Sequence, residues 1–433
     1  MVLKTGMKLI IFFVVFSFCV SFSYTDTPQN DPEELPEDMI GIKLRDYRIY
    51  LETHPPLDRL YISGDKGFFL VTKEELREVR ELGIAIIGQK KLHPSLPGLN
   101  SKKDGVNGRF HNYRETEEML MDLEDRYPDI ADVFSIGRTV EGRDIFMIKI
   151  SDNVRIDEEE PNVFVVGCHH AREWISVEVP LLFARYVLEH YGDNPEVQRV
   201  INGSQLYILP ILNPDGLEFS IHVYRWWRKN RSYNGNYSWG TDLNRNYGYQ
   251  WGYDDSGSSP DPYSNIYRGA SPFSEQETGA LRQFYLAHPP AGTLSYHNYS
   301  QSIGYPWGYT YNPAPDEAEM DAIAREMSRR IFRVNGRYYT YGKTTDLLYT
   351  TNGDHDDWVY GIFGVPAFTY ELPPADYLHG AFINAEEEID SIAAENFPAI
   401  LYFANYFIDG EGESSSEDPV VKTDPMKINP DKK

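Results

Sequence analysis

The chain has 433 residues, of which 41% are hydrophobic and 14% aromatic, so it can bury a large core and is not disordered throughout. Its formal net charge of -25, from 41 Lys and Arg against 66 Asp and Glu, repels phosphate backbones and anionic lipids, so we expect neither nucleic acid nor membrane as a partner of the mature protein. The sequence contains only two cysteines, which excludes a disulfide framework as the source of stability.

The N-terminus has the pattern of a secretory signal peptide. Two lysines precede an apolar run over 9–16, and small residues follow at Ser21 and Ser23, the spacing that a signal peptidase reads. The run falls short of the ~20 residues that a membrane span needs, and a lipid anchor at Cys19 is disfavoured by the bulky residue before it. The sequence therefore predicts a signal peptide over 1–23 and a secreted, extracellular protein.

Two segments follow the signal peptide. Residues 24–38 are rich in acids and proline and cannot bury enough apolar surface to become ordered, so we expect a solvated leader. Residues 39–88 predict a small α/β unit. Its expected elements are strands over 47–51, 67–71 and 84–87 and a helix over 72–82.

Residues 89–108 have the composition of an exposed linker. Several prolines and glycines interrupt any regular element, and two dibasic pairs occur, Lys90-Lys91 and Lys102-Lys103. Exposed loops with such residues are preferred sites of proteolysis, so we expect the linker to be cleavable.

From 109 to 408 the sequence alternates between strand-like and helix-like segments. The expected helices cover 115–127, 174–191, 274–287 and 389–407, and the expected strands cover 145–150, 163–166, 206–212 and 367–370. Residues 163–166 are a continuous apolar run, which is typical of a parallel strand buried on both faces. The pattern predicts an α/β domain with a mixed, largely parallel central sheet flanked by helices. Residues 409–433 are acidic and serine-rich, and we expect a disordered tail.

A possible metal motif lies in G-C-H-H-A-R-E-W at 167–174, where a buried strand gives way to a helix. Ligands gather beyond the carboxyl ends of strands in such sheets. His170 and Glu173 are three residues apart, which on one helical turn lets an imidazole and a carboxylate bind the same cation. A third ligand is needed for zinc, and His297, at the end of another strand-like run, is the best candidate. His-x-x-Glu alone is more often a surface histidine beside a helix-capping acid.

Other catalytic signatures are missing from the sequence. It has no His-Glu dipeptide, which excludes the His-Glu-x-x-His class, and no Gly-x-Ser-x-Gly elbow. Cys168 lies in a hydrophobic strand end, so an inert buried thiol is favoured over a nucleophile.

From about 110 to 407 the chain resembles the zinc metallocarboxypeptidases of the carboxypeptidase A/B type, the funnelins. The resemblance is carried by an ordered series of motifs rather than by one. They are H-H-A-R-E-W at 169–174, N-P-D-G at 213–216, R-W-W-R-K-N-R-S at 225–232, D-L-N-R-N at 242–246, S-P-F-S-E at 271–275, S-Y-H-N-Y-S at 295–300 and F-T-Y-E-L at 368–372.

The resemblance implies one zinc ion bound by His170, Glu173 and His297. It also implies that Asp242 holds His170 through the second ring nitrogen, as acids behind metal ligands commonly do. Glu371 matches the general base, which takes a proton from the attacking water and passes it to the departing amine. This set of residues is the basis for expecting a hydrolase.

The resemblance assigns further residues to the substrate. Arg228 matches the cation that polarises the scissile carbonyl. Asn244 and Arg245 match the pair that binds the terminal carboxylate, and Tyr349 matches the mobile tyrosine that closes over it. The positions that line neighbouring subsites are Arg172 and Tyr299, and the chain departs from its relatives at Asn298, where serine is more common.

The expected specificity comes from the loop over 349–358. Asp356 falls where relatives that cut after Lys or Arg place an acid at the base of the pocket, and Asp354 is a second candidate, as in relatives with mixed basic and apolar preference. The alternative is that both acids cap a turn. Gly308 and Thr344, also expected near the pocket, do not decide between these interpretations.

The sequence therefore predicts a secreted zinc carboxypeptidase that removes C-terminal residues, basic or mixed basic and apolar, from peptides and proteins. By the same resemblance, the unit over 39–88 is a prodomain that a trypsin-like protease releases. Two alternatives remain at this point: a cell-wall peptidase of the same fold that cuts γ-glutamyl or diaminopimelate bonds, and an inactive peptide-binding module.

Overall fold

The computed structural model describes residues 39–45, 58–63, 66–71, 73–81, 84–92, 107–235, 238–376 and 379–408. The expected signal peptide, acidic leader and tail, most of the linker with Lys102-Lys103, and the expected strand over 47–51 lie outside these residues. In the part of the chain that the structure describes, no helix is long and apolar enough to cross a membrane.

The N-terminal unit is a four-stranded antiparallel sheet with one helix. In sheet order its strands are β2 (Asp58–Ser63), β3 (Lys66–Val71), β1 (Met39–Arg45) and β4 (Ile86–Leu92). Helix α2 (Lys73–Glu81) lies against β1 and β3 and buries Leu76 and Val79, three residues apart on one helical face.

Strand β4 extends into the segment expected as linker. Lys90 lies opposite Gly41 of β1, and Lys91 lies opposite Ile40. The first dibasic pair is therefore part of a paired strand rather than of a loop.

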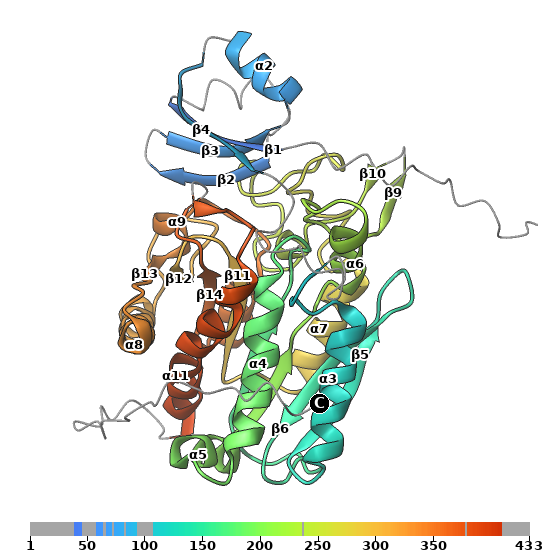
Figure 1. Cartoon of the computed structure of the whole chain (residues 1–433), viewed down its shortest axis with the longest axis vertical. Helices are drawn as coiled ribbons and strands as arrows, with labels where there is room; N and C mark the ends of the chain where they lie inside the picture. The colour runs from blue at the N-terminus through green and yellow to red at the C-terminus, as the bar shows by residue number, and fades with distance from the viewer. Residues whose placement is uncertain are drawn as a thin grey trace, which may run out of the picture. The chain divides into compact units, whose positions relative to one another are not determined.

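The larger domain is built on an eight-stranded sheet (Figure 1). In sheet order the strands are β13 (Thr340–Lys343), β12 (Ser302–Tyr305), β14 (Ala367–Leu372), β11 (Gly292–Asn298), β7 (Asn162–Gly167), β8 (Gln205–Leu209), β6 (Asp144–Ile150) and β5 (Ala131–Arg138). The central strands β14, β11, β7 and β8 are parallel, and β6, β5 and the β12–β14 pair are antiparallel. A small ribbon of β9 (Tyr233–Gly235) and β10 (Ser238–Trp239) lies outside this sheet. The predicted mixed, largely parallel sheet is confirmed.

Helices cover both faces of the sheet and enclose two hydrophobic cores. The first core is formed with α3 (Tyr113–Arg126), α4 (Ile175–His190), α5 (Pro195–Gly203), α6 (Pro214–His222), α8 (Glu317–Asn335) and α11 (Ile389–Ile408). The second is formed with α7 (Gln276–Ala287) and α10 (His355–Phe363). Short helices α9 (Thr344–Leu347), η1 (Leu243–Arg245) and η3 (Glu386–Glu388) lie in the connections.

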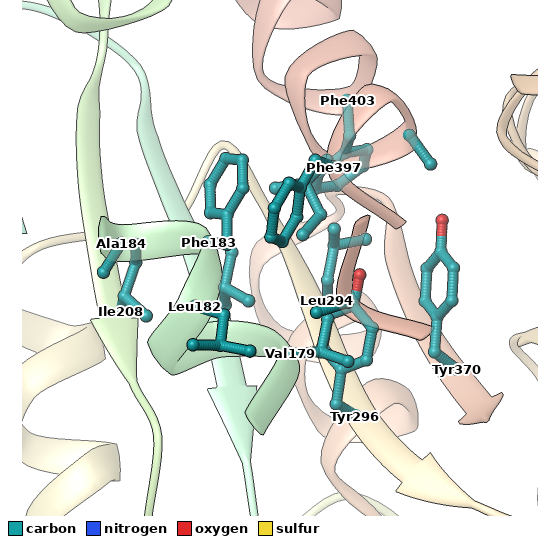
Figure 2. Packing of buried hydrophobic residues seen from close by; sticks show 14 of the residues in the cluster. Val179, Leu182, Phe183, Ala184, Ile208, Leu294, Tyr296, Tyr370, Phe397 and Phe403 are labelled. Atoms are coloured by element: carbon teal, nitrogen blue, oxygen red, sulfur yellow. The ribbon is translucent and has the colours of Figure 1, made fainter. Parts of the chain in front are cut away.

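Helices α4 and α11 pack against the central strands in the first core (Figure 2). Phe183 of α4 and Phe397 of α11 have ring centroids 5.8 Å apart, and Tyr296 of β11 stacks on Tyr370 of β14 at 4.9 Å. Full burial of a phenylalanine side chain contributes roughly 1.5–3 kcal/mol. This packing fixes the central strands, whose ends carry the site described below.

The carboxyl ends of β7, β11 and β14 meet at one edge of the sheet because the three strands are parallel and in register. Gly167, the last residue of β7, lies opposite Tyr296, and His297 lies opposite Glu371 of β14. A Cβ at Gly167 would come within 2.3 Å of the Ser176 carbonyl oxygen, so only glycine permits this close approach. Polar residues that follow these strands therefore converge.

Glu277, in the first turn of α7, is a buried acid without a cationic partner in the described part of the chain. Its Oε2 accepts a hydrogen bond of 3.1 Å from Asn230 Nδ2, whereas Oε1 has no hydrogen-bond partner among the described residues. Burial raises the pKa of Glu277 to about 8.

We predict that this carboxyl makes the protein less stable as the pH rises from about 5 to 8. In that range the unfolded chain loses the proton while the folded protein keeps it, so the free energy of unfolding falls by roughly 1.4 kcal/mol per pH unit from this group. Glu277→Gln removes this contribution. In urea unfolding experiments, the free energy of unfolding of the variant therefore rises relative to that of the wild type as the pH increases. Glu387→Gln, at an exposed position, is the control. Parallel stability curves for Glu277→Gln and wild type contradict the prediction.

Candidate active site

Three side chains converge at the end of the central strands. The spacing of His170 and Glu173 suggested one turn of a helix. The structure instead places both residues in the turn between β7 and α4, because α4 begins only at Ile175. His297 comes from β11. His170 Nδ1 is 2.9 Å from Glu173 Oε1, His297 Nδ1 is 3.0 Å from Glu173 Oε2, and the two Nδ1 atoms are 3.0 Å apart. All three side chains are buried.

The chemistry of these atoms fits a metal ion. His170 Nε2 is 3.1 Å from Asp242 Oδ1 and donates to it, which leaves the Nδ1 lone pair directed at the other two groups. His297 Nε2 is 3.1 Å from Ser295 Oγ, so its Nδ1 is likewise directed inward. Lone pairs of two imidazoles and a carboxylate that meet in a buried place favour a cation between them. Two histidines and a glutamate are a known donor set of catalytic zinc.

Asp242 connects this site to Arg228. The guanidinium donates from Nε and Nη2 to Asp242 Oδ2, at 3.1 and 2.9 Å, and its Nη1 is 3.8 Å from Glu173 Oε1. Burial opposes ionisation of Asp242, but Arg228 and His170 hold its pKa well below the ordinary value. Asp242 is therefore a carboxylate shared by a metal ligand and a buried cation.

Glu371 comes from β14, the strand that pairs with β11 beside the three converging side chains. It is less buried than its neighbours, and its strand position is directly beside His297. Burial and the negative charge of Glu173 raise the pKa of Glu371 well above the ordinary value, while Arg228 and Arg245 oppose that rise. A carboxyl in this environment can both accept and return a proton.

Asn244 and Arg245 lie in η1, directly after Asp242. Arg245 donates from Nε to Gly257 O at 2.7 Å and from Nη1 to Asn244 O at 2.6 Å, and the guanidinium lies 5.9 Å from the centre of the Tyr349 ring. The Asn244 side-chain oxygen accepts the backbone N–H of His355 at 2.9 Å. Two carbonyl contacts thus orient the guanidinium, and the contact with His355 orients the amide group.

Arg172 and Tyr299 meet at a third residue, Phe382. The Arg172 guanidinium lies 4.1 Å from the centre of the Phe382 ring, and the Tyr299 ring contacts it edge-on at 5.1 Å. Asn298, beside Tyr299, is buried, and its Nδ2 is 3.3 Å from Asn384 Oδ1. These residues form one cluster.

The acids of the loop over 349–358 lie at the start of α10 and differ in their contacts. Asp354 is the N-cap: its Oδ1 accepts Asp357 N–H at 2.8 Å, and its Oδ2 accepts the Thr351 hydroxyl. Asp356 instead accepts from two side chains, Thr369 Oγ1 at 2.6 Å and His355 Nδ1 at 3.0 Å. The alternative that both acids cap a turn therefore holds for Asp354 but not for Asp356.

Several residues around the site were not found from the sequence. His169 Nε2 is 2.9 Å from the Tyr247 hydroxyl, and its Nδ1 is 3.3 Å from Ser295 Oγ, which links it to His297. Burial lowers the pKa of His169 well below the ordinary value, so the ring is neutral. The one available signal was the two-residue period of β11, which places Ser295 and His297 on the same face.

Cys168, the other residue weighed as a nucleophile, is fully buried at the end of β7. Burial raises the pKa of its thiol, so the thiolate is not available. Its environment is that of an inert core residue.

Comparison with known proteins gives a consistent family. The zinc carboxypeptidase family matches residues 116–399. The chain is 32% identical over 305 residues to carboxypeptidase B of Astacus astacus, covering 69% of this chain and 97% of that one, and 31% identical over 301 residues to carboxypeptidase A1 of Rattus norvegicus, covering 69% and 70%.

Solved structures agree with this assignment. Carboxypeptidase A from Helicoverpa armigera superposes with a TM-score of 0.74 at 25% identity, covering 86% of this chain and 98% of that chain. Thrombin activatable fibrinolysis inhibitor superposes with a TM-score of 0.75 at 24% identity, covering 87% and 100%. With His170, Glu173 and His297 positioned to hold the metal, the chain belongs to the zinc carboxypeptidase family and is a zinc-dependent hydrolase.

Proposed function

We propose that this zinc carboxypeptidase is secreted and removes C-terminal Lys or Arg from peptides and proteins. The observation that carries the specificity is Asp356: a buried carboxylate in the first turn of α10, held by Thr369 and His355 rather than by the backbone. A buried acid selects a cationic side chain because an unpaired charge on either partner is costly. Relatives named carboxypeptidase B are among the matches to this chain.

His170, Glu173 and His297 would hold the zinc ion, and Asp242 would fix the His170 ring. When bound, the ion supplies Lewis acidity to the scissile carbonyl and lowers the pKa of a water molecule. Glu371 takes the proton from the attacking water and returns it to the leaving amine, a role suited to a carboxyl whose pKa lies above the ordinary value.

The remaining residues bind and orient the substrate. Arg228, held by Asp242, donates to the carbonyl oxygen as negative charge develops there. Asn244 and Arg245 bind the terminal carboxylate, and Tyr349 closes over it. The cluster of Arg172 and Tyr299 around Phe382 lines the subsites for residues farther from the cut. Asp354, the second candidate acid, is engaged as the N-cap of α10, so Asp356 is the proposed acid of the specificity pocket.

We also propose that the protein is made as a precursor. The signal-like pattern over 1–23 supports secretion, and the N-terminal sheet with α2 supports a prodomain. Of the two dibasic pairs, Lys90-Lys91 is paired with β1, and a protease needs an extended, unpaired segment. Cleavage is therefore proposed at Lys102-Lys103.

For catalysis we predict that Glu371→Gln lowers kcat by a factor on the order of 10² to 10⁴ while the protein keeps stoichiometric zinc. The amide keeps the size of the side chain but cannot transfer the proton. Zinc content is measured by elemental analysis and kcat on a peptide substrate. Glu387→Gln serves as the matched surface control. An active Glu371→Gln enzyme would falsify the assigned role.

For specificity we predict that peptides ending in Lys or Arg have higher kcat/KM than otherwise identical peptides ending in Leu, Phe or Glu. Asp356→Asn should reduce the ratio of kcat/KM for the Lys peptide to kcat/KM for the Leu peptide roughly a hundredfold, because the cationic side chain loses its buried partner. Asp193→Asn, an exposed acid, leaves the ratio unchanged. A preference for Glu, or for γ-glutamyl and diaminopimelate peptides, is the result that contradicts the proposal.

For activation we predict that a trypsin-like protease raises peptidase activity and that the active product begins after Lys103. The variant Lys102→Gln/Lys103→Gln should resist activation, whereas Lys90→Gln/Lys91→Gln should be activated like wild type. N-terminal sequencing and a peptidase assay measure both. Equal activity before and after clipping rules out the zymogen.

A further inference from the structure

We propose that His355 is a positioning residue of the specificity pocket, whose ring holds the Asp356 carboxylate and whose backbone N–H holds Asn244. The inference rests on the proposed preference for basic C-terminal residues. It adds a residue to which the motifs gave no role. It also explains how one short segment positions the groups that bind the side chain and the groups that bind the terminal carboxylate of the residue to be removed.

The three acids at the start of α10 are not equivalent. Asp354 caps the helix, and Asp357 accepts the backbone N–H groups of Gly308 at 2.8 Å and Tyr309 at 2.9 Å. Asp356 alone of the three has side-chain donors on both oxygens, namely His355 and Thr369. The orientation of the Asp356 carboxylate therefore depends on these two side chains.

The His355 ring is itself fixed by its surroundings. It is 1% exposed, and its Nε2 is 3.2 Å from the Tyr285 hydroxyl, which in turn is 3.2 Å from Thr293 Oγ1. The rings of Tyr247 and His169 lie 5.3 and 5.4 Å from it. Since Nδ1 faces a carboxylate oxygen, it carries the proton, and Nε2 accepts from the tyrosine.

The backbone of the same residue holds the other end of the pocket. His355 N–H donates to Asn244 Oδ1 at 2.9 Å, and this bond fixes the orientation of the Asn244 amide group. The backbone N–H of Asn244 donates in turn to Asp242 Oδ1 at 3.0 Å. Residue 355 thus links the carboxylate-binding segment to the side-chain pocket, and a rotation of this turn would move both.

The two functions of His355 can be separated by substitution. Any residue except proline keeps the backbone N–H and hence the contact with Asn244. Asn places an amide nitrogen near the position of Nδ1 and keeps the donor to Asp356. Gln places its amide near Nε2 and keeps a partner for Tyr285 but loses that donor.

The experiment compares kcat/KM on two peptides that differ only in a C-terminal Lys or Leu. We expect His355→Gln to lower the Lys-to-Leu ratio about tenfold, mainly through KM for the Lys peptide, which corresponds to loss of one hydrogen bond to a charged group. His355→Asn should keep the ratio within about threefold of wild type. Because the ratio is taken within one preparation, it does not depend on the fraction of enzyme that folds. His190→Gln, a partly exposed histidine at the end of α4, is the control.

Asp356→Asn and the double variant His355→Gln/Asp356→Asn complete the cycle. If His355 acts through Asp356, the double variant has the same ratio as Asp356→Asn. The inference is overturned if His355→Gln keeps the wild-type ratio, if His355→Asn loses it to the same extent, or if the two substitutions are additive. If Asp356→Asn itself leaves the ratio unchanged, the proposed basic preference fails instead.

Discussion

The buried carboxylate of Asp242 is the contact on which the chemistry of this site depends. One oxygen accepts a hydrogen bond from His170 Nε2, which turns the Nδ1 lone pair toward Glu173 and His297. The other accepts two hydrogen bonds from Arg228. A buried cation without this partner would be strongly unfavourable, and a histidine without it could rotate or change tautomer. One side chain therefore positions both a metal ligand and the cation assigned to the scissile carbonyl.

The site also requires that a long irregular segment between α6 and α7 be held in place, because Asp242, Asn244 and Arg245 lie in it. Buried asparagines do this by bonding to backbone carbonyls. Asn246 Nδ2 donates to Arg268 O and Ser271 O, at 2.9 and 3.0 Å, and Asn213 Nδ2 donates to Lys229 O at 3.2 Å. An unpaired buried carbonyl is costly, so these amides replace the partners that a strand or helix would provide. The motifs N-P-D-G and D-L-N-R-N are thus partly structural.

The sequence predicted the buried elements better than the amphipathic ones. Strand β7 carries a continuous apolar run over 163–166, and the fold class followed from such strands alternating with helices. Helix α8 (Glu317–Asn335) was missed because charged residues obscure the apolar stripe of Met320, Ile323 and Met327. Helix α10 was treated as a loop, although Asp354 caps its start and Gly364, with a φ of 69°, ends it.

The metal site could be predicted only in part, and the reason is tertiary. His170 and Glu173 are local in sequence, but their spacing indicated a helix, whereas the structure places them in a turn. The approach of His297 to His170 joins residues 127 positions apart, and it is fixed by the register of β7 and β11 rather than by any local pattern. Without the ordered motifs, a strand-end position makes His297 the best candidate for the third ligand, and no local pattern selects Glu371. The hydrogen bonds of Ser295, His169 and His355 depend on side-chain packing and were not accessible to sequence reasoning.

Charge is distributed in a way that suits the proposed substrate. The chain has a formal net charge of -25, which draws basic peptides toward it but repels their terminal carboxylate. The positive charges of arginines near the site oppose that repulsion, because several of these arginines are held by backbone carbonyl oxygens rather than by acidic side chains. Arg245 donates to Gly257 O and Asn244 O, and Arg225 donates to Arg172 O and Phe382 O. Burial and the neighbouring Arg172 lower the pKa of Arg225 to about 9, which is the expected effect on a buried cation that no carboxylate of the described residues neutralises. A carbonyl fixes a guanidinium without cancelling its charge, so Arg245 keeps its positive charge at the place proposed to bind the chain end of the substrate.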